Sequence, residues 1–197
     1  MKVWLQKILG WMDATRHADF LAPLAMRLYL VPVFWQAGMQ KYQNFPDTVD
    51  WFGDMMSGLG LPFPWLMAFL ATATELGGSV SLLFGVGVRW MCIPLLFTMA
   101  VAMATVHWPN GWLAISEDMG PFATDRTMQA VERLDEAKDI LMQYGDYDRL
   151  TEFGHLVILN NGIEFAATYA IMLLTLFFIG AGRYVSIDYW VRRRIQS

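Results

Sequence analysis

Long apolar stretches alternate with short charged connections along most of the chain. A membrane helix needs about 20 consecutive apolar residues, and four stretches come near this length: residues 21–41, 64–88, 90–107 and 157–180. Before them, residues 2–18 place apolar side chains on one helical face and lysines elsewhere, which predicts an amphipathic helix at the membrane interface. The pattern therefore predicts an all-α integral membrane four-helix bundle, forming a single membrane domain over residues 1–197.

A polar stretch separates the third and fourth predicted membrane helices. Residues 108–156 carry ten acidic side chains against four basic ones. Within them, residues 125–144 repeat apolar side chains at helical spacing, with Thr124 or Asp125 to cap the start and Gly145 to end it. This stretch is predicted to be an acidic helical insertion that faces water.

Basic residues concentrate at the two termini and in the short link around Arg89, whereas the two long connections are acidic. Because positive loops stay in the cytoplasm, both termini are predicted to be cytoplasmic and both long connections to lie outside. The composition, 56% hydrophobic and only 16% charged, is typical of a membrane protein, so the lipid bilayer is the first expected partner. The net charge of −4 and the lack of a broad basic patch argue against nucleic acid as a partner.

Glu75 lies in the middle of the second predicted membrane helix. A charge near the bilayer centre costs at least about 2.5–3.5 kcal/mol on insertion scales, so it needs a partner or a function. Two hypotheses stay open: a structural ion pair with Arg27 or Lys41, or a carboxylate that accepts protons or orients a ligand. The face of the helix around it suits contact with another helix rather than lipid, because it is small and polar: Ala71, Thr72, Gly78 and Ser79.

The first predicted membrane helix carries a matching stripe. Its members are spaced so that they share one helical face: Arg27, Phe34, Gly38 and Lys41. Gly38 would let another backbone approach that face closely. Lys41 either snorkels to the outer interface or joins a site, and Arg27 either snorkels toward the cytoplasm or meets a carboxylate.

Polar residues also gather near the outer ends of the third and fourth predicted helices. Asn161, Glu164 and Thr168 share a face of the fourth helix, with Asn160 adjacent, and His107 ends the third. Polar stripes of this kind line interior cavities or helix seams in membrane proteins. Lys41, Glu75, His107 and Glu164 are therefore predicted to meet in one polar pocket that opens on the outer side of the membrane, with Arg27 nearer the cytoplasm.

Each residue of this predicted pocket has an expected role. The carboxylates would accept protons, Lys41 would hold an anionic or carbonyl group, and His107 could relay protons. The predicted catalytic residues are Glu75, Glu164, His107, Lys41 and Arg27. The predicted cofactor-binding residues are Asn160, Asn161 and Trp108.

Met99, Met103 and His107 follow one another at intervals of four residues. Thioether and imidazole ligands suit Cu(I), so the three form a candidate metal site. Methionine is also an ordinary filler of apolar helices, and the chain contains 14 of them, so packing is the competing interpretation. The sequence carries no zinc-type cluster, P-loop or dinucleotide-binding fingerprint.

Five motifs are shared with a known family: the arginine of LAMRLYL, the segments AGMQK and TELGG, the glutamate of NNGIEFAA, and the closing GAGRYVSIDYW. Over nearly its whole length the chain thereby resembles the DoxX family of four-helix bacterial membrane proteins. The segments LVPVFWQAGMQKYQNFPDTVDWFG, GLGLPFPWL and VHWPNGW resemble the HvfX-type branch of that family. This resemblance implies a place in the bacterial inner membrane and in the maturation of copper-binding peptides, with the peptide and its modifying proteins as partners.

The wider family also includes the membrane subunit associated with thiosulfate:quinone oxidoreductase, which implies quinone as a candidate cofactor beside copper. The leading hypothesis is an accessory redox or maturation factor for a copper-binding peptide system, with a periplasm-facing polar pocket. One alternative is a quinone-linked oxidoreductase subunit. The others are a non-catalytic scaffold that docks partners through the acidic insertion, and a small transporter, which would need a homo-oligomer to enclose a path. A catalytic and a non-catalytic role both stay open.

Overall fold

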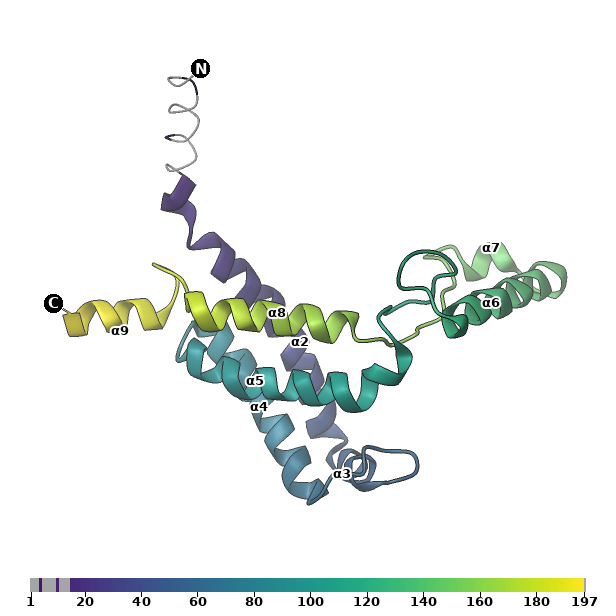
Figure 1. Cartoon of the computed structure of the whole chain (residues 1–197), viewed down its shortest axis with the longest axis horizontal. Helices are drawn as coiled ribbons and strands as arrows, with labels where there is room; N and C mark the ends of the chain where they lie inside the picture. The colour runs from purple at the N-terminus through teal and green to yellow at the C-terminus, as the bar shows by residue number, and fades with distance from the viewer. Residues whose placement is uncertain (1–3, 5–9, 11–14, 197) are drawn as a thin grey trace. The chain divides into compact units, whose positions relative to one another are not determined.

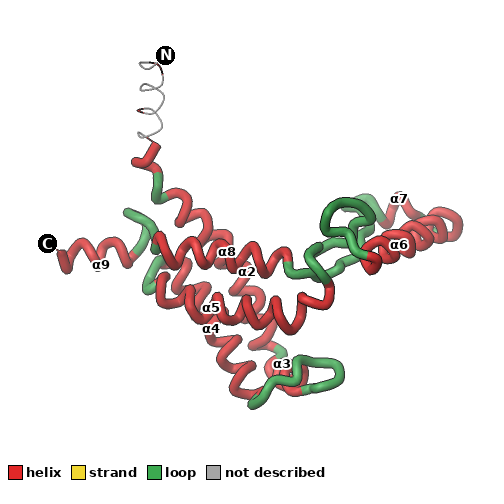
Figure 2. The backbone as a smooth tube through the Cα atoms, viewed as in Figure 1, coloured by secondary structure: helices red, strands yellow, loops and turns green. Residues whose placement is uncertain are grey.

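The computed structural model describes residues 4, 10 and 15–196. Within them every regular element is helical, apart from an isolated antiparallel β-bridge between Ile115 and Leu159 (Figures 1 and 2). The predicted all-α class is thereby confirmed. The chain divides into two compact units, Met1–Thr98 with Tyr169–Ser197, and Met99–Thr168.

The first unit contains four helices in full: α2 (Leu21–Gln43), α3 (Phe45–Gly53), α4 (Pro64–Phe84) and α9 (Ile187–Gln196). It shares α5 (Val88–Ala102) and α8 (Glu164–Ile179) with the second unit, because the division falls within these two helices. The predicted interfacial helix over residues 2–18 falls mostly on residues 2–3, 5–9 and 11–14, which lie outside the described residues. Its last part, Thr15–Ala18, is the short 3-10 helix η1.

Three helical stretches in the described part of the chain are long and apolar enough to cross a membrane: Thr15–Gln43, Pro64–Phe84 and Val88–Asn110. They correspond to the first three predicted membrane helices. The fourth candidate, α8, is a strongly apolar helix of 16 residues, shorter than the roughly 20 residues of a typical crossing. The fourth crossing, and with it the four-helix bundle, stays a prediction.

Helix α8 begins at Glu164, whereas the sequence predicted a helix from residue 157 onward. The residues before it are held in an extended run by backbone bonds to residues 111–116; Asn160 N donates to Ala114 O, and Glu164 N donates to Trp112 O. Asn161 has a φ of 60°, which an α-helix does not allow. The predicted start is therefore wrong, because hydrophobicity alone does not separate a buried extended segment from the first turns of a helix.

Helices α2 and α4 form the packed core of the first unit. The buried face of α2 includes Arg27, Phe34 and Gly38, as the predicted stripe requires. A Cβ atom added to Gly38 would lie 2.8 Å from Leu76 Cγ and 3.1 Å from the Leu76 backbone N. Only glycine fits at this distance, so Gly38 sets how closely α2 approaches α4.

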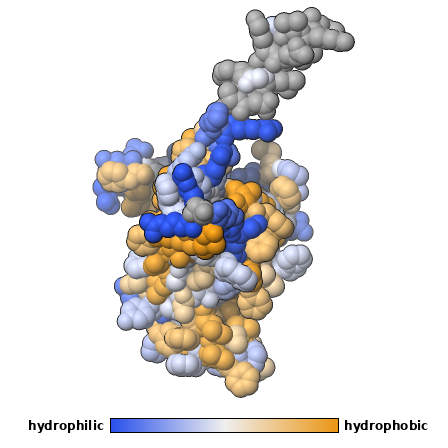
Figure 3. Space-filling model, turned by 90° about the vertical axis from the view of Figure 1, so that its left-hand side faces the viewer, coloured by the Kyte–Doolittle hydropathy of each residue, from blue (hydrophilic) through white to orange (hydrophobic). Residues whose placement is uncertain are grey.

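Large apolar side chains cover the outward sides of these helices, as expected of surfaces that face lipid rather than water. They include Leu28 and Trp35 of α2, Phe69 and Leu83 of α4, and Phe97 of α5. In Figure 3, hydrophilic side chains gather directly against a wide hydrophobic area. This contrast is the pattern expected where a membrane surface meets water.

The second unit holds the acidic insertion. Its main helix, α6 (Asp125–Tyr144), has the bounds that the sequence predicts, and the short α7 (Tyr147–Leu150) follows. Thr124 and Thr127 cap the start of α6 reciprocally, each side chain accepting from the other residue's backbone N–H. Before the insertion, α5 continues into the π-helical turn η2 (Met103–His107) and the 3-10 turn η3 (Trp108–Asn110). The position of the insertion outside the membrane stays a prediction.

Candidate functional site

Lys41 and Glu75 form a two-pronged ion pair between α2 and α4. The Lys41 ammonium donates to both carboxylate oxygens of Glu75, over 2.9 Å to Oε1 and 2.8 Å to Oε2. The Glu75 side chain is 6% exposed and the Lys41 side chain 24% exposed. Of the two partners that the sequence offers for Glu75, the structure therefore selects Lys41.

The packing of the two helices explains this alignment. Gly38 lies one turn before Lys41 and lets α2 approach α4 beside Leu76, the neighbour of Glu75. The hydroxyls of Thr72 and Ser79 donate to carbonyls of their own helix, those of Ala68 and Leu76. They therefore do not compete with Lys41 for the carboxylate, which is left as an acceptor for the ammonium.

Arg27 lies apart from this pair and serves a different purpose. Its Nη1 donates to the carbonyl of Leu82 over 2.9 Å, and its Nη2 to the carbonyl of Val185 over 2.6 Å. The residue is only 1% exposed. Leu82 lies in the last turn of α4, where carbonyls lack intrahelical partners, so Arg27 caps that helix end and ties it to the segment before α9. Neither snorkelling nor direct pairing with a carboxylate describes it.

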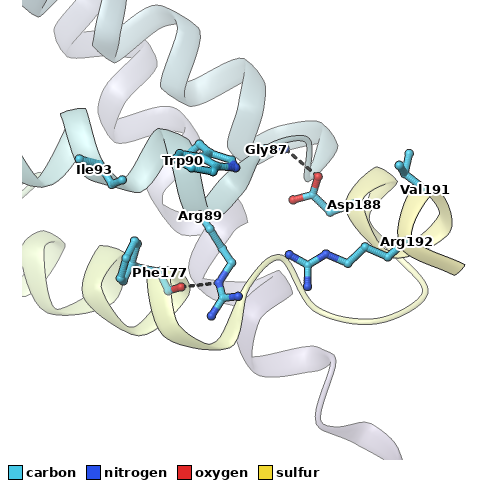
Figure 4. Close-up of a pocket in the computed structure, with 8 residues that line it drawn as sticks. All are labelled: Gly87, Arg89, Trp90, Ile93, Phe177, Asp188, Val191 and Arg192. Atoms are coloured by element: carbon cyan, nitrogen blue, oxygen red, sulfur yellow. Dashed lines mark hydrogen bonds between the residues drawn. The ribbon is translucent and has the colours of Figure 1, made fainter. Parts of the chain in front are cut away.

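A second polar cluster joins the link between α4 and α5 to the C-terminal segment, and sequence reasoning missed it. The Asp188 carboxylate accepts from the backbone N–H groups of Gly87 and Val88, over 2.7 and 3.1 Å, at the start of α5. Arg89 donates to the carbonyls of Phe177 and Phe178 near the end of α8, each over 2.7 Å (Figure 4). A signal was present, because Asp188 belongs to the GAGRYVSIDYW motif and Arg89 is the charge of the short link.

In the second unit, Glu164 is the first residue of α8 rather than part of its interior. Its Oε2 accepts from the Ala114 backbone N–H over 2.9 Å. The predicted helical face shared by Asn161, Glu164 and Thr168 does not exist, because Asn161 precedes the helix. Glu164 thus connects the extended run before α8 to residues 111–116.

Asn160 is 2% exposed and holds the same two segments together. Its amide nitrogen donates to the carbonyls of Asn110 and Leu113, over 2.8 and 2.6 Å, and its Oδ1 accepts from Arg126 over 3.1 Å. Both functions of the amide group are used within the fold. A ligand-binding role for Asn160, Asn161 and the 70%-exposed Trp108 stays a prediction.

His107 ends the π-helical turn that also contains Met103. Its Nδ1 lies 2.9 Å from the carbonyl oxygen of Asn161. Because a carbonyl can only accept, the proton belongs on Nδ1, and Nε2 is left as the nitrogen with a free lone pair. Among the described residues, no three or more His, Cys, Asp or Glu side chains are grouped to hold a metal ion. A site with Met99 and Met103 would therefore depend on thioether ligands.

The predicted site residues thus fall into three groups. Lys41 and Glu75 form one, Arg27 another at the end of α4, and His107, Asn160 and Glu164 lie in the second unit. The predicted meeting of Lys41 and Glu75 with His107 and Glu164 in one pocket stays a prediction.

The chain is similar to a known family and to bacterial relatives. The DoxX family model matches residues 22–108. The chain is 28% identical over 116 residues to the "Inner membrane protein YphA" of Escherichia coli (strain K12), covering 56% of this chain and 78% of that protein. It is 30% identical over 86 residues to the "Putative oxidoreductase CatD" of Bacillus subtilis (strain 168), covering 44% of this chain and 60% of that protein. No solved structure matches.

Proposed function

We propose that this chain, whose residues 22–108 match the DoxX family model, is a multi-pass protein of the bacterial inner membrane that assists a redox or maturation reaction at the Lys41–Glu75 pair. The loop charges support an orientation with both termini in the cytoplasm. The name of the Bacillus subtilis relative supports a redox role. The observation that carries the proposal is the buried ion pair itself.

The pair has the properties of a binding site as well as those of a brace. Buried ion pairs contribute little net stability compared with apolar packing, because desolvation offsets their attraction. An ammonium has three N–H donors, and Glu75 uses two of those of Lys41 within the described structure. The third is available to an incoming carbonyl or anionic group, since the Lys41 side chain is 24% exposed at the edge of the pair.

A quinone is the ligand class that suits this arrangement best, because its ring is apolar and its two carbonyl oxygens accept hydrogen bonds. A bound quinone would supply the electron-accepting chemistry, for which two electrons from a partner redox protein and two protons are required. Lys41 would donate an N–H to one carbonyl oxygen and pass a proton to it. Glu75 would hold the ammonium in place as a carboxylate, while solvent would reprotonate Lys41 through its exposed side and supply the second proton.

The quinone content of the purified protein tests this proposal. Wild-type protein extracted from bacterial membranes in mild detergent is expected to retain near-stoichiometric quinone. Glu75→Gln is expected to stay folded and to retain at least roughly tenfold less quinone than wild type, because it loses a charge-assisted contact at the site. Glu136→Gln, the same change on the exposed side of α6, is the control and should match wild type. Absence of quinone from the wild type, or equal content in Glu75→Gln, would contradict the quinone assignment, and unfolding of Glu75→Gln would make the pair structural.

A second candidate function is handling of Cu(I) in the maturation of a copper-binding peptide. The observation in its favour is the fixed orientation of His107, whose Nδ1 is held by Asn161 while Nε2 is left as a ligand atom. Met103 occupies the other end of the same π-helical turn, and such turns often mark functional sites. Thioether and imidazole together suit Cu(I).

Copper analysis under reducing conditions tests this second candidate. His107→Ala is expected to lower the bound copper by roughly tenfold or more, in line with loss of a direct metal ligand. His155→Ala, which removes an exposed histidine from the same unit, is the matched control and should bind as wild type does. Equal copper in all three proteins would remove the metal assignment and leave Met99 and Met103 as packing residues.

A further inference from the structure

A cavity of about 600 Å³ opens beside the Asp188 cluster of the first unit. One part of its wall is apolar, formed by Trp90, Ile93, Phe177 and Val191, and the other part carries Arg89 and Arg192 (Figure 4). A smaller cavity of about 190 Å³ shares both arginines and continues along Gly180 and Gly182. Neither cavity belongs to the Lys41–Glu75 site.

The charges of this cavity leave an excess of positive charge facing the open space. Arg89 donates from Nε and Nη2 to carbonyls at the end of α8. Its guanidinium has no carboxylate partner among the described residues. Figure 4 shows the Arg192 guanidinium directed toward Arg89. Asp188 is the acidic residue of the lining, and its two oxygens accept from the backbone of Gly87 and Val88. Two guanidinium groups therefore face the cavity. The Asp188 carboxylate in its lining is already hydrogen-bonded to backbone N–H groups at the start of α5.

The apolar part of the wall is unusually open. Trp90 is 80% exposed, and Ile93 and Val191 are each 49% exposed. The cavity lies where the link between two membrane helices meets the end of α8, at the level expected for lipid headgroups. Exposed apolar side chains at the headgroup level suit contact with acyl chains. The arginines beside them suit phosphate, to which a guanidinium can bond through two N–H groups.

We propose that this cavity binds an anionic glycerophospholipid. Arg89 and Arg192 hold the phosphodiester oxygens, and the first segments of the acyl chains lie against Trp90, Ile93 and Phe177. Basic pockets between membrane helices on the cytoplasmic side recognise anionic headgroups in this way, and the loop charges assign this end of the helices to the cytoplasm. The inference does not depend on the function proposed for Lys41 and Glu75.

Native mass spectrometry of the detergent-solubilised full chain tests it, with phosphatidylglycerol and phosphatidylcholine of identical acyl chains as probes. Wild type is expected to favour the anionic lipid by roughly fivefold, the scale of one arginine near an anionic membrane surface. Arg192→Gln is expected to abolish most of this preference, because Arg192 is exposed and its replacement should leave the fold intact. Arg149→Gln is the control, since it removes the same charge from an exposed pair in the second unit.

Each outcome of this experiment either supports or overturns the lipid-binding site. A preference that disappears in Arg192→Gln and persists in Arg149→Gln supports the site. Equal binding of the two lipids by wild type, or an unchanged preference in Arg192→Gln, overturns it. Inorganic phosphate is added as a competitor in a further arm. Displacement of the lipid by phosphate at low millimolar concentration would show a small-anion site and overturn the assignment to a lipid.

Discussion

Replacing Lys41 with methionine is expected to lower the free energy of unfolding by about 3–5 kcal/mol, the usual cost of removing one partner from a buried ion pair. The reason lies in the unequal burial of the two side chains. Glu75 is 6% exposed and cannot reach water when the ammonium is removed, whereas Lys41 is 24% exposed. Glu75→Gln should therefore cost less, about 1.5–3 kcal/mol, the range for loss of a charge-assisted hydrogen bond. Denaturant titration of the purified protein in detergent measures both values.

The control for this prediction is Lys138→Met on α6. Lys138 pairs with Asp135 over 2.9 Å, but the Asp135 side chain is 63% exposed, so the same substitution should change stability by no more than about 1 kcal/mol. Equal effects of Lys41→Met and Lys138→Met would mean that Glu75 is accessible to water. A larger cost for Glu75→Gln than for Lys41→Met would reverse the assigned order of burial.

Replacing Gly162 with alanine is expected to disrupt the second unit. The added Cβ would collide with the carbonyl oxygen of Leu113 and would lie 2.6 Å from that of Trp112 and 2.7 Å from that of Gly111. These are backbone atoms, so no side chain can move aside, and the extended run before α8 must separate from residues 111–116. The cost should reach or exceed the roughly 1–3 kcal/mol of ordinary overpacking. Faster amide hydrogen exchange of Asn160 and Glu164, which both bond across this contact, measures the effect.

Asn161→Gly is the control next to this position. It removes a side chain from a residue with a φ of 60°, a conformation that glycine adopts at less cost. Its carbonyl can still accept from His107, so exchange at Asn160 and Glu164 should stay as slow as in wild type. Slow exchange in Gly162→Ala would contradict the close contact described for this segment.

The face that α2 presents to α4 could be predicted from the sequence. The spacing of Arg27, Phe34, Gly38 and Lys41 fixes a common side of any α-helix, and the cost of a buried charge requires a partner for Glu75. Helix periodicity therefore decided which residues would meet. Periodicity could not decide which cation pairs with Glu75, because Arg27 and Lys41 lie on the same face of α2 at different positions along its axis.

The contacts that sequence reasoning missed depend on backbone groups. Arg27 and Arg89 donate to carbonyls at helix ends, and Asp188 accepts from N–H groups at another. A sequence shows side-chain charges but does not show which backbone groups lack partners, so these roles could not be read from it. The extended run before α8 was missed for a related reason: its apolar residues fit a membrane helix equally well, and the residues that hold it, 111–116, lie far away in the chain.

The most direct test of whether the Lys41–Glu75 pair is a functional site is the quinone content of the charge-swapped variant Lys41→Glu/Glu75→Lys. The swap keeps opposite charges between α2 and α4, so it should recover most of the stability that Lys41→Met loses. It also moves the ammonium to the more buried position and the carboxylate to the more exposed one. The account predicts a folded protein that has lost the quinone retained by wild type. A folded swapped variant with wild-type quinone content would contradict it and would leave the pair as a brace between two helices.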